Sequence, residues 1–293
     1  MEAEKQRAAG ASLAFNLISM AAKIVAAVLS GSVSMLSEAI NSAVDVASSS
    51  IAFVGVRAAA VPPDEEHPYG HGKIESLAGF GESILLFLTV IYIVAESIHR
   101  LIVGQEIAQV EVALWVMAAS TLGSFLVSRY VFSVARRSGS LALLSNGQHL
   151  AADFWTSAGV LVALGLTKFA GWKQADAVIA LVLAIWIGIT AIKLSKTAFH
   201  ELIDRRLTEE DLDQIEAVLA SDKRLLSYHR MRTRRSGHMR YVDLHIVVPR
   251  DWSVVEAHRV ADDLEKTMEH ALAPAKVVIH VDPYDEEKAG GKR

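Results

Sequence analysis

The sequence predicts an α-helical membrane protein followed by a small α+β domain. Hydrophobic residues make up 52% of the 293-residue chain and charged residues only 21%. The apolar residues of the first two thirds lie in repeated runs of about 20 residues or more, the length that a helix needs to cross a bilayer. After residue 206 these runs give way to short alternating segments and two helical segments, a pattern typical of a soluble α+β fold.

Six apolar runs predict six transmembrane helices, at residues 8–29, 33–59, 74–102, 110–135, 141–170 and 175–194. Between the second and third runs, paired prolines and two glycines predict a polar loop. Lysine and arginine gather near the run ends that share one side of the membrane. By the positive-inside rule this side is the cytoplasm, so both termini are expected there.

Residues 207–285 predict one domain with the element order αββαβ. Thr208 and Asp211 form a capping pattern that opens a helix ending near residue 221. The alternation of apolar and polar residues and the turn signals predict the later elements, which are strands at 227–235 and 239–248, a helix at 254–271 and a strand at 276–281. The expected domains are therefore 1–206 in the membrane and 207–285 outside it, with a charged, disordered tail at 286–293.

Charge and cysteine content narrow the classes of function. A net charge of −4 gives no indication of a nucleic-acid partner. The chain contains no cysteine, which excludes disulfides and thiolate metal sites. Any metal must therefore be held by histidine, carboxylate and amide groups.

Two pairs of metal-capable side chains lie inside predicted membrane helices. Asn41 and Asp45 are four residues apart in the second run, and His149 and Asp153 are four apart in the fifth. Residues at this spacing share one face of a helix. Ionisable groups at membrane depth are costly and face the bundle interior, so they mark functional sites. We expect the two pairs to form one four-ligand site. The simpler alternative is that Asn41 and His149 only hydrogen-bond between helices.

The polar loop between the second and third runs carries three further candidates. Asp64, His67 and His71 lie within eight residues of one another, on a segment shaped by several prolines and glycines. The alternative is a solvated loop whose histidines cap the third helix.

These features, in this order, resemble the cation diffusion facilitator family of divalent-metal/proton antiporters. The resemblance rests on the two intramembrane pairs, on the loop pattern from Asp64 to Lys73, on the segment Leu202-Ile203-Asp204-Arg205, and on a tail domain that bears histidines. It implies an intramembrane metal site, a second metal site at the loop and a homodimer in a bacterial inner membrane. It also implies a ferredoxin-like fold for the tail. The chain departs from the family at Asn41, where Asp is more usual.

The resemblance also implies a cytoplasmic metal cluster at the dimer interface. Period-2 alternation turns His280 and Asp282 to one face of the last strand, and His245 away from the apolar face of its own strand. The residues that match the family cluster are His229, His245, His258, His280 and Asp282.

The ligand types bear on the choice of ion. With both aspartates ionised and His149 neutral, the intramembrane site carries a charge of −2, which matches one divalent ion. Zinc is the first expectation, while the amide oxygen of Asn41 makes the site harder and allows manganese or iron. Two other classes of function are the alternatives. A membrane metallo-hydrolase would need a catalytic motif that the chain lacks, and a non-transporting metal sensor or scaffold would not require charges inside the membrane.

Overall fold

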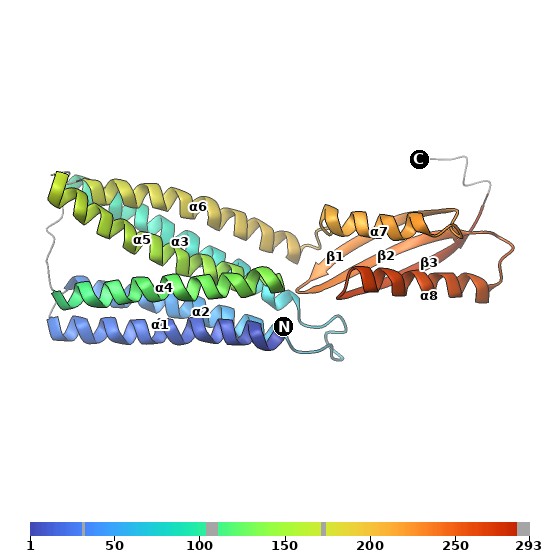
Figure 1. The fold of residues 1–293 in the computed structure, drawn as a ribbon, viewed down its shortest axis with the longest axis horizontal. Coiled ribbons are helices and arrows are strands. Elements are labelled where there is room, and N and C mark those ends of the chain that lie inside the picture. The colour runs from blue at the N-terminus through green and yellow to red at the C-terminus, as the bar shows by residue number, and fades with distance from the viewer. Residues whose placement is uncertain (31–32, 104–110, 171–173, 286–293) are drawn as a thin grey trace. The chain divides into compact units, whose positions relative to one another are not determined.

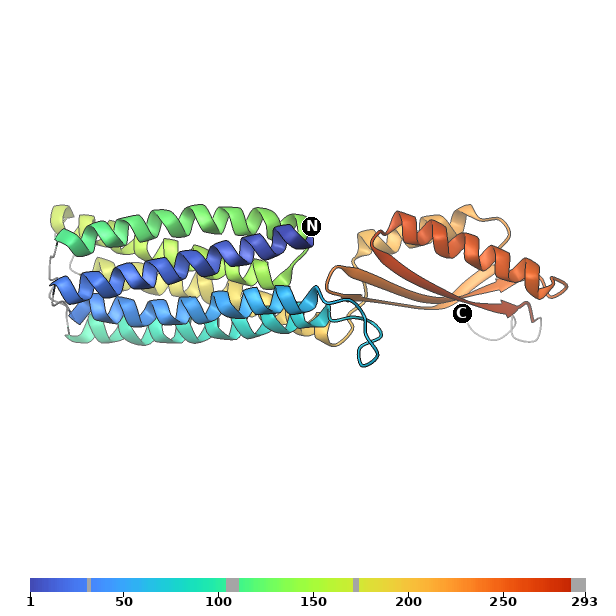
Figure 2. The same ribbon diagram turned by 90° about the horizontal axis from the view of Figure 1, so that it is seen from below.

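The computed structural model describes residues 1–30, 33–103, 111–170 and 174–285. The chain divides into two compact units, Met1–Phe199 and His200–Arg293. The first unit is a bundle of long helices (Figures 1 and 2). Their bounds are α1 Glu2–Ser30, α2 Val33–Ala59, α3 Lys73–Val103, α4 Glu111–Ser138, α5 Leu141–Ala170 and α6 Ala175–Leu202.

Three of the described helices are long and apolar enough to cross a membrane by length and composition, over Glu2–Leu29, Lys73–His99 and Ala177–Leu202. The prediction of six spans is therefore supported for α1, α3 and α6. The other three helices have similar lengths of 27, 28 and 30 residues. Their crossing of the membrane stays a prediction.

Small residues let the helix backbones approach closely, as in other membrane bundles. A Cβ added at Gly55 of α2 would lie 2.3 Å from the Cβ of Ala78 on α3. At Gly123 of α4, an added Cβ would lie 2.3 Å from the ring of Phe15 on α1. Helix α2 packs against α1, α3 and α5, and α3 also packs against α5. These contacts place α2 and α5, the two helices with paired candidate ligands, side by side.

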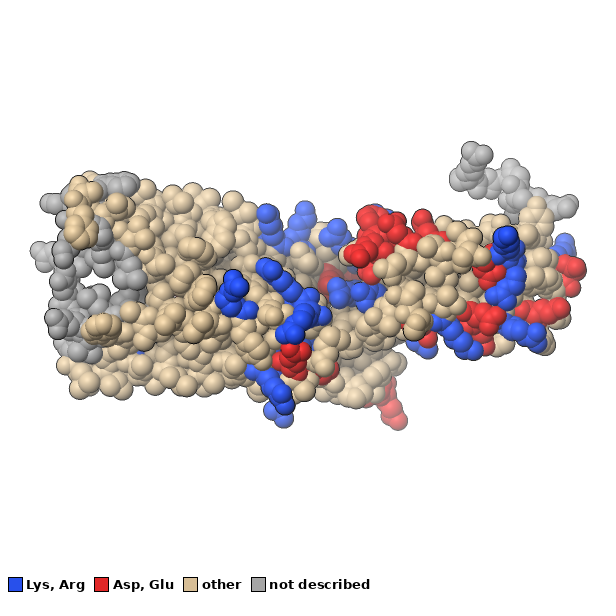
Figure 3. Space-filling view, viewed as in Figure 1, with Lys and Arg blue, Asp and Glu red and all other residues tan. Residues whose placement is uncertain are grey.

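Charged residues of the first unit gather at one end of the bundle. Figure 3 shows Lys and Arg side chains at this end of the bundle. The rest of the bundle surface that is coloured in this view is almost free of them. They include Arg57 in the last turn of α2 and Arg136 and Arg137 in the last turn of α4.

The second unit contains a three-stranded sheet covered by helices on one face (Figure 2). Its elements are α7 Glu209–Ser221, β1 Ser227–Ser236, β2 Met239–Val248, α8 Val254–Ala271 and β3 Ala275–Pro283. Strand β2 lies in the centre, antiparallel to β1 and parallel to β3. The predicted order αββαβ is the order observed, and Thr208 is the N-cap of α7, accepting a hydrogen bond from the backbone N–H of Asp211.

The core of the second unit lies between the sheet and its two helices. Val242, Leu244 and Ile246 of β2 are buried there against Ile215 of α7 and Leu264 of α8. Side chains alternate between the two faces of a strand. The residues between these, including His245, therefore lie on the face that α7 and α8 leave open.

Candidate metal centres

The first candidate centre lies between α2 and α5. His149 Nε2 is 3.1 Å from Asp45 Oδ1, and the His149 side chain is only 2% exposed. Asp153 follows one turn after His149. One ligand atom from each of these three residues lies within 4.8 Å of the others. The bundle therefore brings together three of the four predicted intramembrane ligands, from two separate helices.

Buried polar contacts fix the register of these helices. Asn16 of α1 donates to the backbone oxygen of Asp45 at 3.1 Å and to Ser49 Oγ at 2.6 Å. Asn146 of α5 donates to the same Ser49 oxygen at 3.3 Å. Ser49 is one turn beyond Asp45, and Asn146 is nearly one turn before His149. The hydrogen bonds to Ser49 therefore place the Asp45 and His149 side chains opposite each other.

Asn41 is the predicted ligand whose place is least defined. It lies one turn before Asp45 on α2, and its side chain is exposed in the single chain. Beside it, Lys23 Nζ donates to Ser42 Oγ at 2.8 Å, so α1 brings a positive charge close to this turn of α2. Lys23 was not among the predicted site residues. The role of Asn41 as a ligand stays a prediction.

The loop candidates also come together. His67 Nδ1 lies 3.3 Å from Asp64 Oδ1, and His71 Nε2 lies 3.3 Å from Asp64 Oδ2. The hydrogen bond from the backbone N–H of His67, at 2.6 Å, is the main reason that the pKa of Asp64 is lowered. Gly70, at a φ of 79°, supplies the left-handed residue that turns the loop back. The three side chains could hold one ion, with ligand atoms within 4.8 Å.

The tail candidates form a row across the sheet. His229 of β1 pairs in register with His245 of β2, which pairs with His280 of β3. The carboxylate of Asp282 contacts all three histidines. Its Oδ2 is 2.9 Å from His245 Nδ1 and 3.2 Å from His229 Nε2, and its Oδ1 is 3.4 Å from His280 Nε2. Burial opposes ionisation of Asp282, but the hydrogen bond from His245 and the positive charge of the histidines lower its pKa overall.

His258 does not join this row within one chain. It lies on α8, the helix that covers the opposite face of the sheet, and its side chain is 72% exposed. Its nearest carboxylate is that of Asp262, at 3.8 Å. Sequence matching placed His258 in the cluster, but sequence cannot show that a helix lies on the far side of the sheet. Membership of His258 would require a second subunit.

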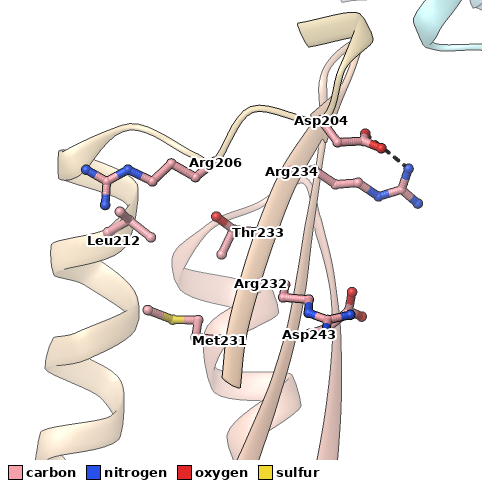
Figure 4. Close-up of a pocket in the computed structure, with 8 residues that line it drawn as sticks. All are labelled: Asp204, Arg206, Leu212, Met231, Arg232, Thr233, Arg234 and Asp243. Carbon is pink, nitrogen blue, oxygen red and sulfur yellow. Dashed lines mark hydrogen bonds and ion pairs between the residues drawn. The ribbon is translucent and has the colours of Figure 1, made fainter. Parts of the chain in front are cut away.

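A cavity of about 470 Å³ in the second unit is a separate feature (Figure 4). Its lining includes Arg206, Arg232 and Arg234 together with Asp204 and Asp243. Arg234 pairs with Asp204 at 3.4 Å. Its three arginines outnumber its two aspartates, so the charge of the lining does not favour binding of a cation.

Comparison with known proteins identifies the family. Residues 10–203 match the model of the cation efflux transmembrane domain, and residues 207–284 match that of the cation efflux protein cytoplasmic domain. The chain belongs to the cation efflux family. This confirms the resemblance to the cation diffusion facilitators. It also makes the protein a membrane transporter of cations and not an enzyme.

Two cation-efflux pumps are similar to nearly the whole chain, and a solved domain is similar to part of it. The cation-efflux pump FieF of Pectobacterium atrosepticum is 31% identical over 276 residues, covering 94% of this chain and 92% of its own. FieF of Escherichia coli O127:H6 is 31% identical over 287 residues, covering 98% and 95%. The metal-bound C-terminal domain of the CzcD transporter from Thermotoga maritima is 32% identical, covering 25% of this chain and 87% of its own. Its TM-score of 0.25 is too low to show a common fold.

Proposed function

We propose that this protein exports a divalent metal ion in exchange for protons, and that the ion binds between α2 and α5. The observation that carries the proposal is the group formed by Asp45, His149 and Asp153, in which His149 is buried and the two aspartates are partly buried. Charged side chains inside a membrane bundle mark ion pathways. Two carboxylates and one neutral imidazole match the charge of one divalent ion, and Asn41, one turn before Asp45, is the proposed fourth ligand.

Proton coupling follows from the chemistry of the ligands. A metal ion binds deprotonated carboxylate and imidazole, so protons and metal compete for the same atoms. An imidazole has an unperturbed pKa of about 6.5, which suits exchange near neutral pH. His149 is therefore the proposed main proton carrier. The bundle rocks between states open to either side, and the ion leaves when protons replace it.

The preferred ion is proposed to be zinc, with manganese or iron as competitors. Zinc accepts nitrogen and oxygen ligands in a tetrahedral arrangement. The three residues that the structure brings together offer both types of ligand. An amide oxygen from Asn41 would favour a harder ion such as manganese.

The arrangement proposed for the whole protein comprises residues 1–206 as six spans and residues 207–285 as a ferredoxin-like cytoplasmic domain. The end of the bundle that carries Arg57, Arg136 and Arg137 faces the cytoplasm by the positive-inside rule. The histidine row of the tail domain lies on a sheet face that its own helices leave uncovered, where a second subunit could pack. Metal bound there would favour one state of the homodimer and would not itself be transported.

Transport in proteoliposomes tests the proposal. In the wild type, a pH gradient is expected to drive zinc flux in the direction opposite to the protons. Asp45→Ala and Asp153→Ala are expected to abolish this flux. Asp251→Ala removes an exposed carboxylate of the second unit and serves as the matched control. Zinc binding by the wild type without any flux would overturn the proposal and favour a metal sensor.

A further inference from the structure

Glu82 of α3 is a buried acid that the proposed transport site does not use. Its side chain lies in the membrane-spanning unit and the residue is 1% exposed. The carboxyl faces the backbone of Ala52 on α2. Even so, neither of its oxygens forms a hydrogen bond within the described part of the chain. Glutamate is almost never fully buried unless it is paired, so this residue calls for a functional explanation.

Other unpaired polar atoms lie on the helices next to Glu82. They are Ser48 Oγ on α2, and Asn146 Oδ1 and His149 Nδ1 on α5. Ser145 of α5 donates to the backbone oxygen of Gly79 on α3 at 3.1 Å. Helices α3 and α5 run in the same direction (Figure 1).

The register places Glu82 within about two helical turns of the metal centre, because Ala52, which the carboxyl faces, lies seven residues beyond Asp45 on α2. Glu82 is three residues after Gly79, and His149 is four residues after Ser145. At about 1.5 Å of rise per residue, both lie about 5 Å beyond the same interhelical contact. Buried polar groups without protein partners are commonly satisfied by internal water. We therefore expect water between Glu82 and the centre.

Charges around Glu82 do not compensate it. The described titratable groups on helices that pack against α3 are Asp45 and Arg57 of α2, His149 and Asp153 of α5, and Lys193, Lys196, His200 and Glu201 of α6. Within the described residues, none of them forms a hydrogen bond or ion pair with Glu82. An ionised carboxylate without a partner is strongly disfavoured in such surroundings. A divalent ion at the neighbouring centre would supply the missing positive charge, since a bound cation is the largest local charge in its site.

We propose that Glu82 is a proton-exchanging residue of the transport cycle. This inference rests on the proposed antiport. When the intramembrane centre is empty, Glu82 is a neutral carboxylic acid. When a divalent ion binds, the O–H bond of Glu82 breaks, the electron pair stays on the carboxylate and the proton passes to water. When the ion leaves, Glu82 takes one proton back, so one proton moves at this residue in each cycle.

Counting protons tests the inference. Detergent-solubilised full-length protein is titrated with zinc alone, in buffers of different ionisation enthalpy, to measure the protons released per zinc bound. Glu82→Gln is expected to release up to one proton fewer than wild type, with the same number of zinc ions bound. Glu82→Asp keeps the acid and is expected to restore the release. Glu96→Gln makes the same change at a partly exposed site of α3 and should match wild type.

Infrared difference spectra give a second readout that needs no transport. Zinc binding to the wild type is expected to remove a protonated-carboxyl band that Glu82→Gln lacks from the start. Equal proton release by wild type and Glu82→Gln, or a band that zinc leaves unchanged, would overturn the role of Glu82. If wild-type proteoliposomes move zinc without counter-moving protons, the antiport itself is wrong. If wild type and Glu82→Gln exchange the same number of protons per zinc ion, only the inference about Glu82 fails.

Discussion

Asn41 differs from the other three intramembrane candidates because it carries no ionisable group. It cannot release a proton, and as a ligand it offers a neutral oxygen. With His149 neutral, the charge of the centre is therefore set by Asp45 and Asp153. We therefore predict that Asn41 affects the preference between harder and softer ions.

Replacing Asn41 by Asp is expected to strengthen zinc binding. An added carboxylate changes the charge of the centre from −2 to −3. The affinity for zinc should rise about tenfold or more, because mutations of residues that only contact a metal ligand already change metal affinity by about this factor. The measurement is the flux of zinc in the presence of competing manganese, compared between Asn41→Asp and wild type. Ser50→Asp, a change on the same helix outside the ligand set, is the control. Equal competition in wild type and Asn41→Asp would show that Asn41 is not a ligand.

The histidine row of the second unit has a different expected role. His280→Ala removes one member of a group that Asp282 holds together, so metal affinity at this cluster should fall about 10- to 100-fold. Flux should continue with weaker apparent affinity, since the transport ligands are intact. Isothermal titration and proteoliposome flux check the two effects. His270→Ala, on α8 and outside the row, is the control, and complete loss of flux in His280→Ala would contradict a regulatory role.

At the scale of elements, α8 is held by a capping box. Ser253 Oγ accepts from the backbone N–H of Glu256 at 3.2 Å, and the Glu256 carboxylate accepts from the backbone N–H of Ser253 at 2.9 Å. Ser253→Ala is expected to destabilise the helix by about 1 kcal/mol. Hydrogen exchange of the first α8 amides in the full-length protein measures the loss. Thr267→Ala, at an exposed position of the same helix, should leave those amides unchanged.

The same cap gives α8 a pH dependence. Hydrogen bonds from the Ser253 backbone and hydroxyl lower the pKa of Glu256 below its ordinary value of 4.5. A lowered pKa in the folded state means that the stabilisation is present above pH 4.5 and is lost as the pH falls through the lower folded value. Protection of the first α8 amides, measured relative to their intrinsic exchange rates at each pH, should therefore fall below about pH 4.5 in wild type. In Ser253→Ala this loss of protection should be much weaker.

Element boundaries could largely be predicted from sequence. The runs at 33–59 and 141–170 coincide with α2 and α5, and the segments at 239–248 and 254–271 coincide with β2 and α8. Apolar run length and capping residues determine these bounds locally. Helix α6 extends past the predicted residue 194 to Leu202. Lys193 and Lys196 lie in the C-terminal part of this helix, where positive charges are favourable.

The relations between elements were harder to predict. Alternation assigned His245 and His280 to strand faces, but only strand pairing shows that they are register partners of one another and of His229. A register shift between His229 and Arg232 lies within this pairing and has no sequence signal of its own. Burial of Glu82 was not predicted either, since a single acid in an apolar run does not reveal which neighbouring helix it faces.

At the scale of the whole helical unit, a buried ion pair joins α1 to α3. Lys5 Nζ lies 3.1 Å from Glu75 Oε2, and the two side chains are 2% and 4% exposed. Lys5 also contacts Glu2 at 2.9 Å. Burial of Lys5 could not be predicted from the sequence, because this lysine precedes the first apolar run. A buried pair of this kind fixes how two elements meet, because removing either partner leaves an uncompensated charge.

Lys5→Met is therefore expected to destabilise the helical unit by about 3–5 kcal/mol. Adding Glu75→Gln removes the stranded charge and should recover most of the loss, because two uncharged side chains of similar size leave no ion to desolvate. Arg137→Ala breaks the exposed pair with Glu4, whose side chains are 63% and 42% exposed. Such pairs contribute about 0–1 kcal/mol, so this variant is the control. Unfolding of the detergent-solubilised full-length protein measures all three variants. Equal stability of Lys5→Met and Arg137→Ala would show that the bundle does not depend on the Lys5–Glu75 pair.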